Sequence, residues 1–417
     1  MDIKALAEKY ESYIIERRRY YHSCPELSGE EKETRAQLRR DLEAMGVTDI
    51  RELENCCGLT ATIHGGHPGK TVALRSDIDA LPVKEQTGLP FASKNEGKMH
   101  ACGHDNHMAM LLGAAQILNE VKDELYGDVR LIIQPAEEVA TGAKAMLAEG
   151  ALDGVEAIYG AHIWGVLESG LIDVTPGNRM ACCHQFKITV TGVSAHGSAP
   201  HLGIDAIAVS AAIVNNLQQC VSRMNDPLNP LVLTVGTVHG GDRWNCVPRE
   251  GEMEGTVRTF KADTSVEEAM RRVIADTASA FGAAGTLAYK YLTLPVINED
   301  EQLNRIAHDA VVKLYGEEGI GHMPAIMGRA ALAMSSSRRP LVALATKRFE
   351  PTGGVTKPMA RFTVMIRLHE PPGKVRRGRA RPQARQRRDG PVRGGFPGRK
   401  RPLARRGRNA AEMSVSM

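Results

Sequence analysis

The sequence lacks several features that would place it in a particular protein class. No run of about 18 apolar residues exists, so no membrane-spanning helix and no membrane partner are expected. The N-terminus has an amphipathic helical pattern without the apolar core of a signal peptide. A CxxC zinc-knuckle motif is missing, and the eight cysteines include two adjacent pairs, which does not suit a disulfide framework. We therefore expect a cytoplasmic protein with reduced thiols.

Acidic residues are scarce at the C-terminal end. Residues 371–417 contain 15 Lys and Arg against 2 acidic residues, a net charge of +13, so the other residues carry 4 − 13 = −9. This pattern predicts a mildly acidic globule followed by a basic, disordered tail. Such a tail can bind phosphate nonspecifically, but no RNA-binding fold accompanies it, so no specific nucleic-acid partner is expected.

The length of 417 residues favours two domains. In the first part of the chain, buried strands alternate with helices, which predicts an α/β domain with a mainly parallel sheet. Residues 184–294 follow a β-α-β-β-α-β order, which predicts an inserted α+β, ferredoxin-like domain. The expected division is a first domain made of 1–183 and 295–370, the insert at 184–294, and the tail at 371–417.

The residue types that bind metals are densest at positions 99–107, with the sequence MHACGHDNH. A glycine separates Cys102 from His104, and its conformational freedom allows both side chains to converge. Either residue alone would more often have a structural role, but their density favours a metal site. The remaining polar residues are expected to support these two: His100, Asp105 and His107.

Ligand-type residues also follow three predicted strands, and the carboxyl ends of parallel strands meet at one edge of a sheet. Beyond one strand lie Glu137 and Glu138, of which one could bind a metal while the other exchanges protons with the attacking water. A solvated acidic loop is the structural alternative. His162 follows another strand. Asp77 and Asp79 lie at the end of a third predicted strand. They either stabilise the turn there or orient a ligand histidine.

These segments together resemble the aminoacylase/carboxypeptidase metallopeptidase family, in its amidohydrolase branch. That branch contains hippurate hydrolases, N-acyl-amino-acid amidohydrolases and auxin-conjugate hydrolases. Order and spacing hold over roughly residues 15–328. The matching stretches lie within 18–34, 74–82, 100–105, 134–138, 160–162, 192–205 and 245–260.

The resemblance implies a zinc-peptidase-like catalytic domain with an inserted dimerisation or lid domain, and two divalent ions of zinc, manganese or cobalt. It also implies a homodimer formed through residues 184–294, with a small acyl-amino acid as substrate. Its expected metal ligands are Cys102, His104, Glu138 and His162. It further implies that Glu137 is the general acid/base and that Asp79 is the acid that orients a ligand. His196 is expected to stabilise the oxyanion, supplied across a dimer or on domain closure. The residues expected to line the substrate side are His201, Asn245 and Arg258. Arg258 suits a substrate carboxylate because a guanidinium pairs with it bidentately.

The chain departs from the family pattern near its C-terminus. The family has one more histidine ligand, which follows a Met-Gly-(Ser/Gly)-Glu-Asp-Phe segment. Here Met327 and Gly328 precede Arg-Ala-Ala-Leu, and no histidine lies between His322 and His369. Our hypothesis is a shifted reading frame from about residue 329, which resequencing of the locus tests.

We predict a metal-dependent hydrolase that cleaves the amide bond of N-acyl-amino acids and releases a free amino acid. The alternative is a catalytically impaired or dead descendant that binds small molecules or dimerises, with the second ion weakly held because a ligand is missing. The sequence does not determine the acyl group, the preferred amino acid or the metal.

Overall fold

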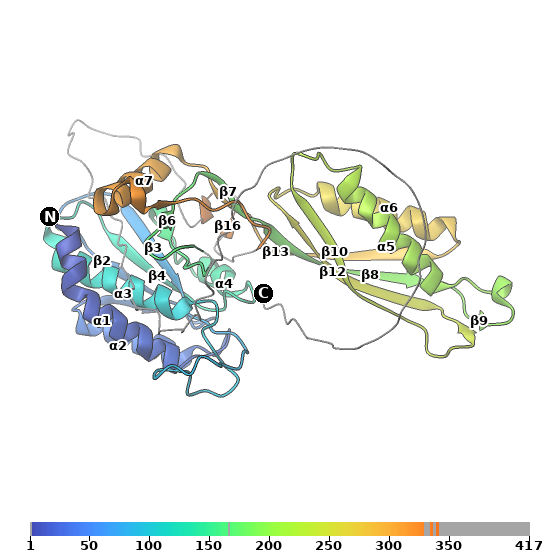
Figure 1. Ribbon diagram of the computed structural model, residues 1–417, viewed down its shortest axis with the longest axis horizontal. Coiled ribbons are helices and arrows are strands. Elements are labelled where there is room, and N and C mark those ends of the chain that lie inside the picture. Colours follow the sequence, from blue (N-terminus) through green and yellow to red (C-terminus); the bar gives the residue numbers. More distant parts are fainter. Residues whose placement is uncertain (1, 166, 329–333, 337–338, 342–417) are drawn as a thin grey trace, which may run out of the picture. The chain divides into compact units, whose positions relative to one another are not determined.

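The computed structural model describes residues 2–165, 167–328, 334–336 and 339–341 (Figure 1). All of them belong to one unit of the chain. The predicted basic tail lies outside the described residues, as does nearly all of the sequence that follows Gly328. The predicted domain boundaries stay a prediction.

A five-stranded sheet organises the first part of the chain, in the order β1-β2-β4-β3-β5. β3 is parallel to β4 and β5, whereas β2 is antiparallel to both β4 and β1. The α/β prediction is confirmed, with a parallel centre and an antiparallel edge. The strands are β1 (Asp49–Glu52), β2 (Leu59–Ile63), β3 (Thr71–Asp77), β4 (Val129–Gln134) and β5 (Val155–Gly160).

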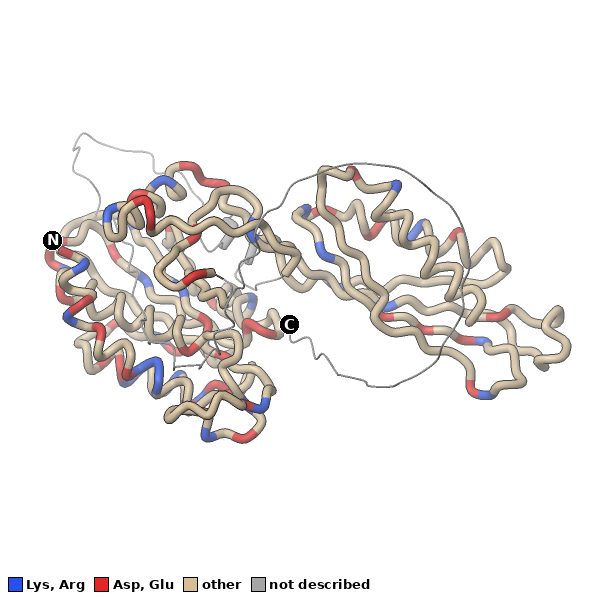
Figure 2. The backbone as a smooth tube through the Cα atoms, viewed as in Figure 1, with Lys and Arg blue, Asp and Glu red and all other residues tan. Residues whose placement is uncertain are grey.

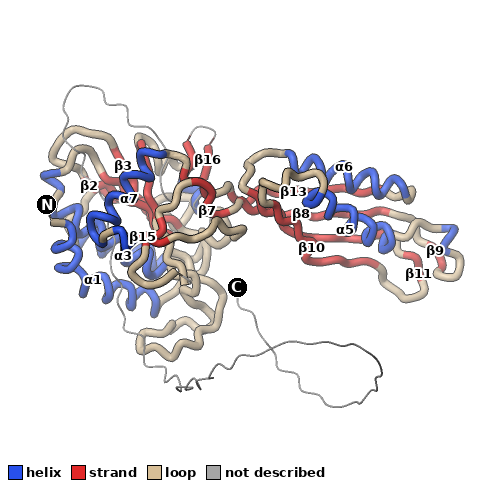
Figure 3. The backbone as a smooth tube through the Cα atoms, turned by 45° about the horizontal axis from the view of Figure 1, so that its top comes forward, coloured by secondary structure: helices blue, strands red, loops and turns tan. Residues whose placement is uncertain are grey.

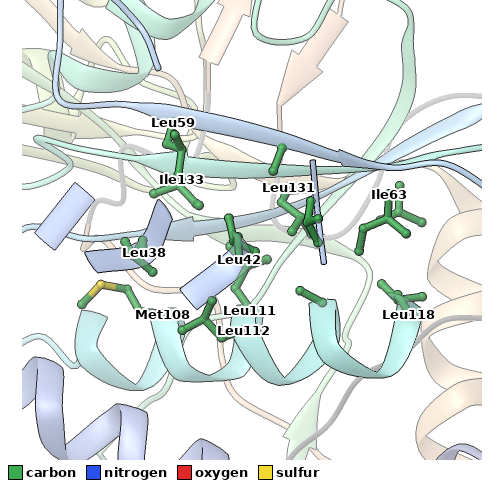
Figure 4. Packing of buried hydrophobic residues seen from close by; sticks show 14 of the residues in the cluster. Leu38, Leu42, Leu59, Ile63, Met108, Leu111, Leu112, Leu118, Leu131 and Ile133 are labelled. Atoms are coloured by element: carbon green, nitrogen blue, oxygen red, sulfur yellow. The ribbon is translucent and has the colours of Figure 1, made fainter. Parts of the chain in front are cut away.

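Helices cover both faces of this sheet. Side chains of β4 alternate. Leu131 and Ile133 pack with α2 and α3 (Figure 4). Ile132 packs on the opposite side with α4. Each fully buried leucine or isoleucine stabilises the fold by about 1.5–3 kcal/mol. The helices are α1 (Ile3–Ser23), α2 (Lys32–Ala44), α3 (His104–Glu120) and α4 (Gly142–Ala148).

The strand ends bring the ligand-type residues to one edge of the sheet. β3 ends at Asp77, β4 is followed by Glu137 and Glu138, and β5 is followed by His162. Because these three strands are parallel, their carboxyl ends lie together. α3 begins at His104, so its first turn belongs to the same edge.

The insert has the predicted β-α-β-β-α-β order and an antiparallel sheet, β10-β12-β8-β13. Both helices lie on one face of it, where they share a core with the strands (Figure 3). A short β9-β11 ribbon extends from one end. The elements are β8 (Cys182–Thr191), β9 (Ala195–His196), α5 (Ala206–Ser222), β10 (Leu231–Gly240), β11 (Cys246–Val247), β12 (Glu250–Thr259), α6 (Ser265–Ala280) and β13 (Ala284–Thr293).

The chain then forms α7 (Glu301–Tyr315). Small strands complete the described residues: β6 (Ile172–Asp173), β7 (Gly177–Met180), β14 (Val296–Asn298), β15 (Ile320–Gly321), β16 (Met334–Ser336) and β17 (Arg339–Leu341).

Acidic and basic residues are interspersed along α1 and α2 (Figure 2). All eight cysteines are free thiols, as expected. Within the described part of the chain, no helix is long and apolar enough to cross a membrane.

Candidate metal centre

His104 occupies the centre of the cluster and is fully buried. Its Nδ1 lies 2.8 Å from the backbone oxygen of Asp79, so the Nδ1–H donates there and Nε2 faces the site, where it can bind a metal once its proton is displaced. This Nε2 lies 3.8 Å from Glu138 Oε1. Among the described residues it has no hydrogen-bond partner.

Cys102 and His162 form the second arm of the cluster. The Sγ of Cys102 lies 3.5 Å from Nε2 of His162. His162 Nδ1 donates to the backbone oxygen of Ile163 at 2.5 Å, so its Nε2 also faces the site with a lone pair. Gly103 has a φ of 93°, a left-handed conformation that fits the conformational role predicted for this glycine.

Glu137 and Glu138 lie in a turn directly after β4. Two non-glycine residues of this turn have positive φ, Ala136 at 49° and Ala140 at 58°. Ligand atoms of His104, Glu137 and Glu138 lie within 4.8 Å of one another, and those of Cys102, His104 and His162 do as well. The structure therefore brings together the four residues predicted as ligands and the residue predicted as acid/base.

This donor set fits a divalent metal. Thiol, imidazole and carboxylate groups together suit zinc and similar borderline ions. The Nε2 of His104 supports the same interpretation. It lies 3.5 Å from Asp77 Oδ2 and 3.8 Å from Glu138 Oε1 but has no hydrogen bond among the described residues, and a ligated ion would recover the free energy that this costs.

Two aspartates hold the ligand segments in place. Asp79 Oδ2 accepts hydrogen bonds from the backbone N of Glu138 at 2.9 Å and from Ser28 Oγ at 2.6 Å. Since His104 donates to its backbone oxygen, Asp79 connects two predicted ligands. Asp77 accepts from His107 Nδ1 at 2.6 Å and from the Arg75 guanidinium at 2.7 Å.

His107 lies near both Asp77 and His104, but its two ring nitrogens are already engaged. Nδ1 donates to Asp77, and Nε2 accepts from the backbone N of Ile163 at 2.9 Å. It therefore fixes the segment that follows His162, in agreement with the supporting role expected from the sequence.

The pKa values follow from burial and nearby charge. Burial, with the neighbouring His107, lowers the pKa of His162 to about 3, so this ring is neutral and able to bind a metal. Burial also lowers the pKa of His104, but Asp77 and Asp79 outweigh it and raise the value well above the usual one. Burial raises the pKa of Cys102. Metal binding must therefore displace protons and weakens as the pH falls.

The four residues expected at the substrate or oxyanion do not come together within the insert. His196, His201 and Asn245 lie near one end, around β9, β11 and the short 3-10 helix Pro200–Leu202 (Figure 1). Arg258 lies at the opposite end of β12, eight residues beyond Glu250, which is about 26 Å along a strand.

Comparison with known proteins identifies the family. The model of peptidase family M20/M25/M40 matches residues 73–357. The N-acyl-L-amino acid amidohydrolase of Geobacillus stearothermophilus is 41% identical over 303 residues, which cover 72% of this chain and 82% of the relative. The chain belongs to peptidase family M20/M25/M40. It is accordingly a metal-dependent hydrolase of the amidohydrolase type.

Two further M20 relatives are similar over most of their length. The N-acetylcysteine deacetylase of Bacillus subtilis is 42% identical over 314 residues, covering 74% of this chain and 82% of the relative. The crystal structure of a dinuclear metal-binding M20 peptidase from Bacillus subtilis matches with a TM-score of 0.68 and 38% identity, covering 78% of this chain and 85% of that one. The comparisons give no support to the alternative of a catalytically impaired chain.

The predicted set of site residues omitted two buried acids, Asp77 and Glu31. Asp77 was noted in the sequence as a strand-end acid, and its link to His107 becomes evident only in the folded chain. Glu31 lies within a stretch that resembles the family, and its carboxylate contacts Ala136, which is 105 residues away. For Glu31 the sequence signal was its place inside that stretch, whereas Asp77 also had its position at the end of a predicted strand.

Proposed function

We propose that the chain hydrolyses the amide bond of N-acyl-amino acids and releases the free amino acid. The observation that carries this proposal is the gathering of one thiol, two imidazoles and two carboxylates at one edge of the sheet. Relatives named for N-acyl-L-amino acids and N-acetylcysteine, at 41% and 42% identity, support the substrate class.

Four residues are proposed to hold two divalent ions: Cys102, His104, Glu138 and His162. The dinuclear metal-binding relative supports the count of two. A divalent ion in such a site supplies Lewis acidity, which acidifies water and polarises an amide carbonyl. The sequence from about 329 onward, where the family has a further histidine ligand, lies outside the described residues apart from β16 and β17.

Glu137 is proposed to take a proton from the attacking water and to deliver it to the departing nitrogen. Its side chain is buried beside Glu138 and His104, where a carboxylate can act without competing bulk water. Asp79 orients His104 through its backbone oxygen and holds the Glu138 backbone through its carboxylate.

On the substrate side, Arg258 is proposed to pair with the carboxylate of the acyl-amino acid. His196 is proposed to stabilise the oxyanion, with His201 and Asn245 beside it. Because Arg258 lies about 26 Å along β12 from the end that carries these three, one chain cannot offer all four to one small substrate. A second chain that contributes His196 removes this difficulty.

A homodimer formed through the insert is therefore part of the proposal. Among the described strands, β10 pairs with β12 alone, so its other edge offers a row of backbone donors and acceptors. Exposed apolar side chains lie near its end, with Val238 54% and Ile207 47% exposed. Edge-to-edge pairing of two β10 strands would bury this surface.

The substrate class is tested by assaying metal-free protein with zinc, manganese or cobalt added back. The panel contains N-acetyl and N-benzoyl amino acids, with unacylated dipeptides and simple amides as controls. We expect metal-dependent release of the free amino acid from the acylated substrates. Preferential cleavage of the dipeptides or simple amides would reject the proposed substrate.

Subunit complementation tests the role of His196 across a dimer. Glu137→Gln and His196→Ala chains are each expected to be inactive alone. If a partner supplies His196, the mixed dimer contains one complete site, so coexpression restores activity. Dimeric mixtures that remain inactive would place His196 in the site of its own chain, and a monomer in sedimentation analysis would refute the dimer itself.

A further inference from the structure

The segment that joins α1 to α2 carries polar side chains that the proposed mechanism does not use. Glu26 receives backbone hydrogen bonds from Glu33 and Thr34, so it caps the start of α2. The backbone oxygen of Glu26 also accepts from Ala80 at 2.8 Å, so the segment lies beside the residue that follows Asp79.

Glu31, at the end of this segment, is fully buried. Its Oε1 accepts a hydrogen bond from the backbone N of Ala136 at 2.8 Å. Ala136 has a φ of 49°, a left-handed conformation that costs an alanine free energy and persists only when its surroundings hold it. Glu137 is the next residue along the chain.

Hydrogen bonds inside the turn complete this arrangement. The backbone oxygen of Ala136 accepts from the N–H groups of Thr141 and Gly142, each at 3.3 Å. The backbone oxygen of Glu137 accepts from Ala140, which also has a positive φ. Glu31 thus contacts the turn from outside it, at the N–H of Ala136, the residue before Glu137.

The peptide that follows Glu137 is anchored as well. The backbone N of Glu138 donates to Asp79 Oδ2 at 2.9 Å, and Ser28 donates to the same oxygen at 2.6 Å. Residues 28–31 therefore hold the backbone on both sides of Glu137, directly through Glu31 and by way of Asp79 through Ser28. These two anchors fix the backbone from which the Glu137 side chain extends.

Burial of the Glu31 carboxylate also needs a reason. Removal from water raises its pKa, although backbone N–H groups that donate to it act in the opposite direction. Burying a carboxylate costs more free energy than burying an apolar side chain of similar size. A hydrogen bond that fixes a strained turn beside a reacting group accounts for it.

We propose that Glu31 is a positioning residue that sets the direction of Glu137 through the N–H of Ala136. The proposal rests on the proposed function, in which Glu137 is the general acid/base. Glu31 itself contacts neither substrate nor metal in this scheme.

The test compares Glu31→Ala with Glu31→Gln, whose amide oxygen can still accept from Ala136. For Glu31→Ala we expect kcat to fall about ten- to hundredfold, with KM and bound metal unchanged. Amide exchange of residues 136–142 should accelerate in the same variant. Glu31→Gln should retain most of kcat and slow exchange. The control Glu26→Ala should lower Tm and leave kcat and this exchange unchanged.

Unchanged kcat or unchanged exchange in Glu31→Ala would overturn the proposal, as would equal losses of kcat in all three variants. Glu137→Gln, measured in parallel, tests the proposed function separately. If that variant retains full kcat, the acid/base role fails, whereas a failure of the Glu31 proposal leaves Glu137→Gln inactive.

Discussion

Glu137 and Glu138 are adjacent in sequence, yet the turn that carries them places the two carboxylates in different surroundings. Glu138 Oε1 lies 3.8 Å from His104 Nε2, and its backbone is held by Asp79. Glu137 is more deeply buried, and the preceding Ala136 has a left-handed backbone. Adjacent residues can divide ligation and proton transfer because such a turn sets their side-chain directions separately.

Exchanging each carboxylate for an amide should separate these tasks. Glu137→Gln should lower kcat about 10²- to 10⁴-fold and leave the metal content unchanged, because it removes the proton acceptor alone. Glu138→Gln should lower metal affinity, and added metal should restore part of its activity. Steady-state kinetics with metal analysis of the purified variants checks both expectations. Loss of metal in Glu137→Gln would contradict the assignment.

The sequence was most informative where ligand-type residues are dense. Cys102, His104 and the Glu pair could be predicted because thiols, imidazoles and carboxylates at strand ends are few and chemically distinct. The engagement of both nitrogens of His107 could not be predicted, since it depends on contacts with Asp77 and Ile163 that only the folded chain creates.

At the scale of elements, the start of α3 determines how the first two predicted ligands are presented. Gly103 has a φ of 93°, and a Cβ there would lie 2.4 Å from the Ile163 side chain. Strand direction could not be predicted, because a short apolar strand such as β2 has the same sequence pattern whether it runs parallel or antiparallel to its neighbour. The antiparallel edge of the sheet was therefore not predicted.

Gly103→Ala should reduce metal affinity about tenfold or more. A left-handed alanine costs about 1–2 kcal/mol, and its Cβ would also displace Ile163, which follows His162, so the backbone between Cys102 and His104 is strained and the approach of the ligands changes. The control is Gly88→Ala, which has a φ of 66° but no atom within 4 Å of the added Cβ. It should lower stability and leave metal affinity unchanged. Metal titration and thermal unfolding distinguish the two, and equal metal affinities would refute the argument.

At the scale of the whole molecule, a buried ionic network links α1 to the first turn of α3. Asp105 Oδ2 contacts His22 Nδ1 at 2.8 Å and Arg18 Nε at 2.9 Å. His22 Nε2 also lies 3.1 Å from Glu85. Burial alone would lower the pKa of His22, but Asp105 and Glu85 outweigh it and raise the value above the usual one.

This raised pKa predicts how stability depends on pH. Protonated His22 stabilises the fold fully below its unfolded pKa of about 6.5, and this contribution is lost as the pH rises through the higher folded value. In metal-free protein, the unfolding free energy of wild type should exceed that of His22→Gln by more at pH 6 than at pH 9. Urea unfolding at both values measures the difference. Glu85→Gln should reduce the difference between the two pH values. If the stability advantage of wild type over His22→Gln instead increases with pH, the predicted direction is wrong.

Metal removal should destabilise the folded chain as a whole, because the predicted ligands come from three separate segments that an ion joins only in the folded state. An ion present at about a hundred times its Kd stabilises that state by about 2.7 kcal/mol. A chelator should therefore lower Tm, and added zinc should restore it. In His162→Ala the chelator should lower Tm by less, because this variant lacks one of the predicted ligands. An unchanged Tm in protein shown by metal analysis to be stripped would mean that bound metal contributes nothing to the stability of this fold.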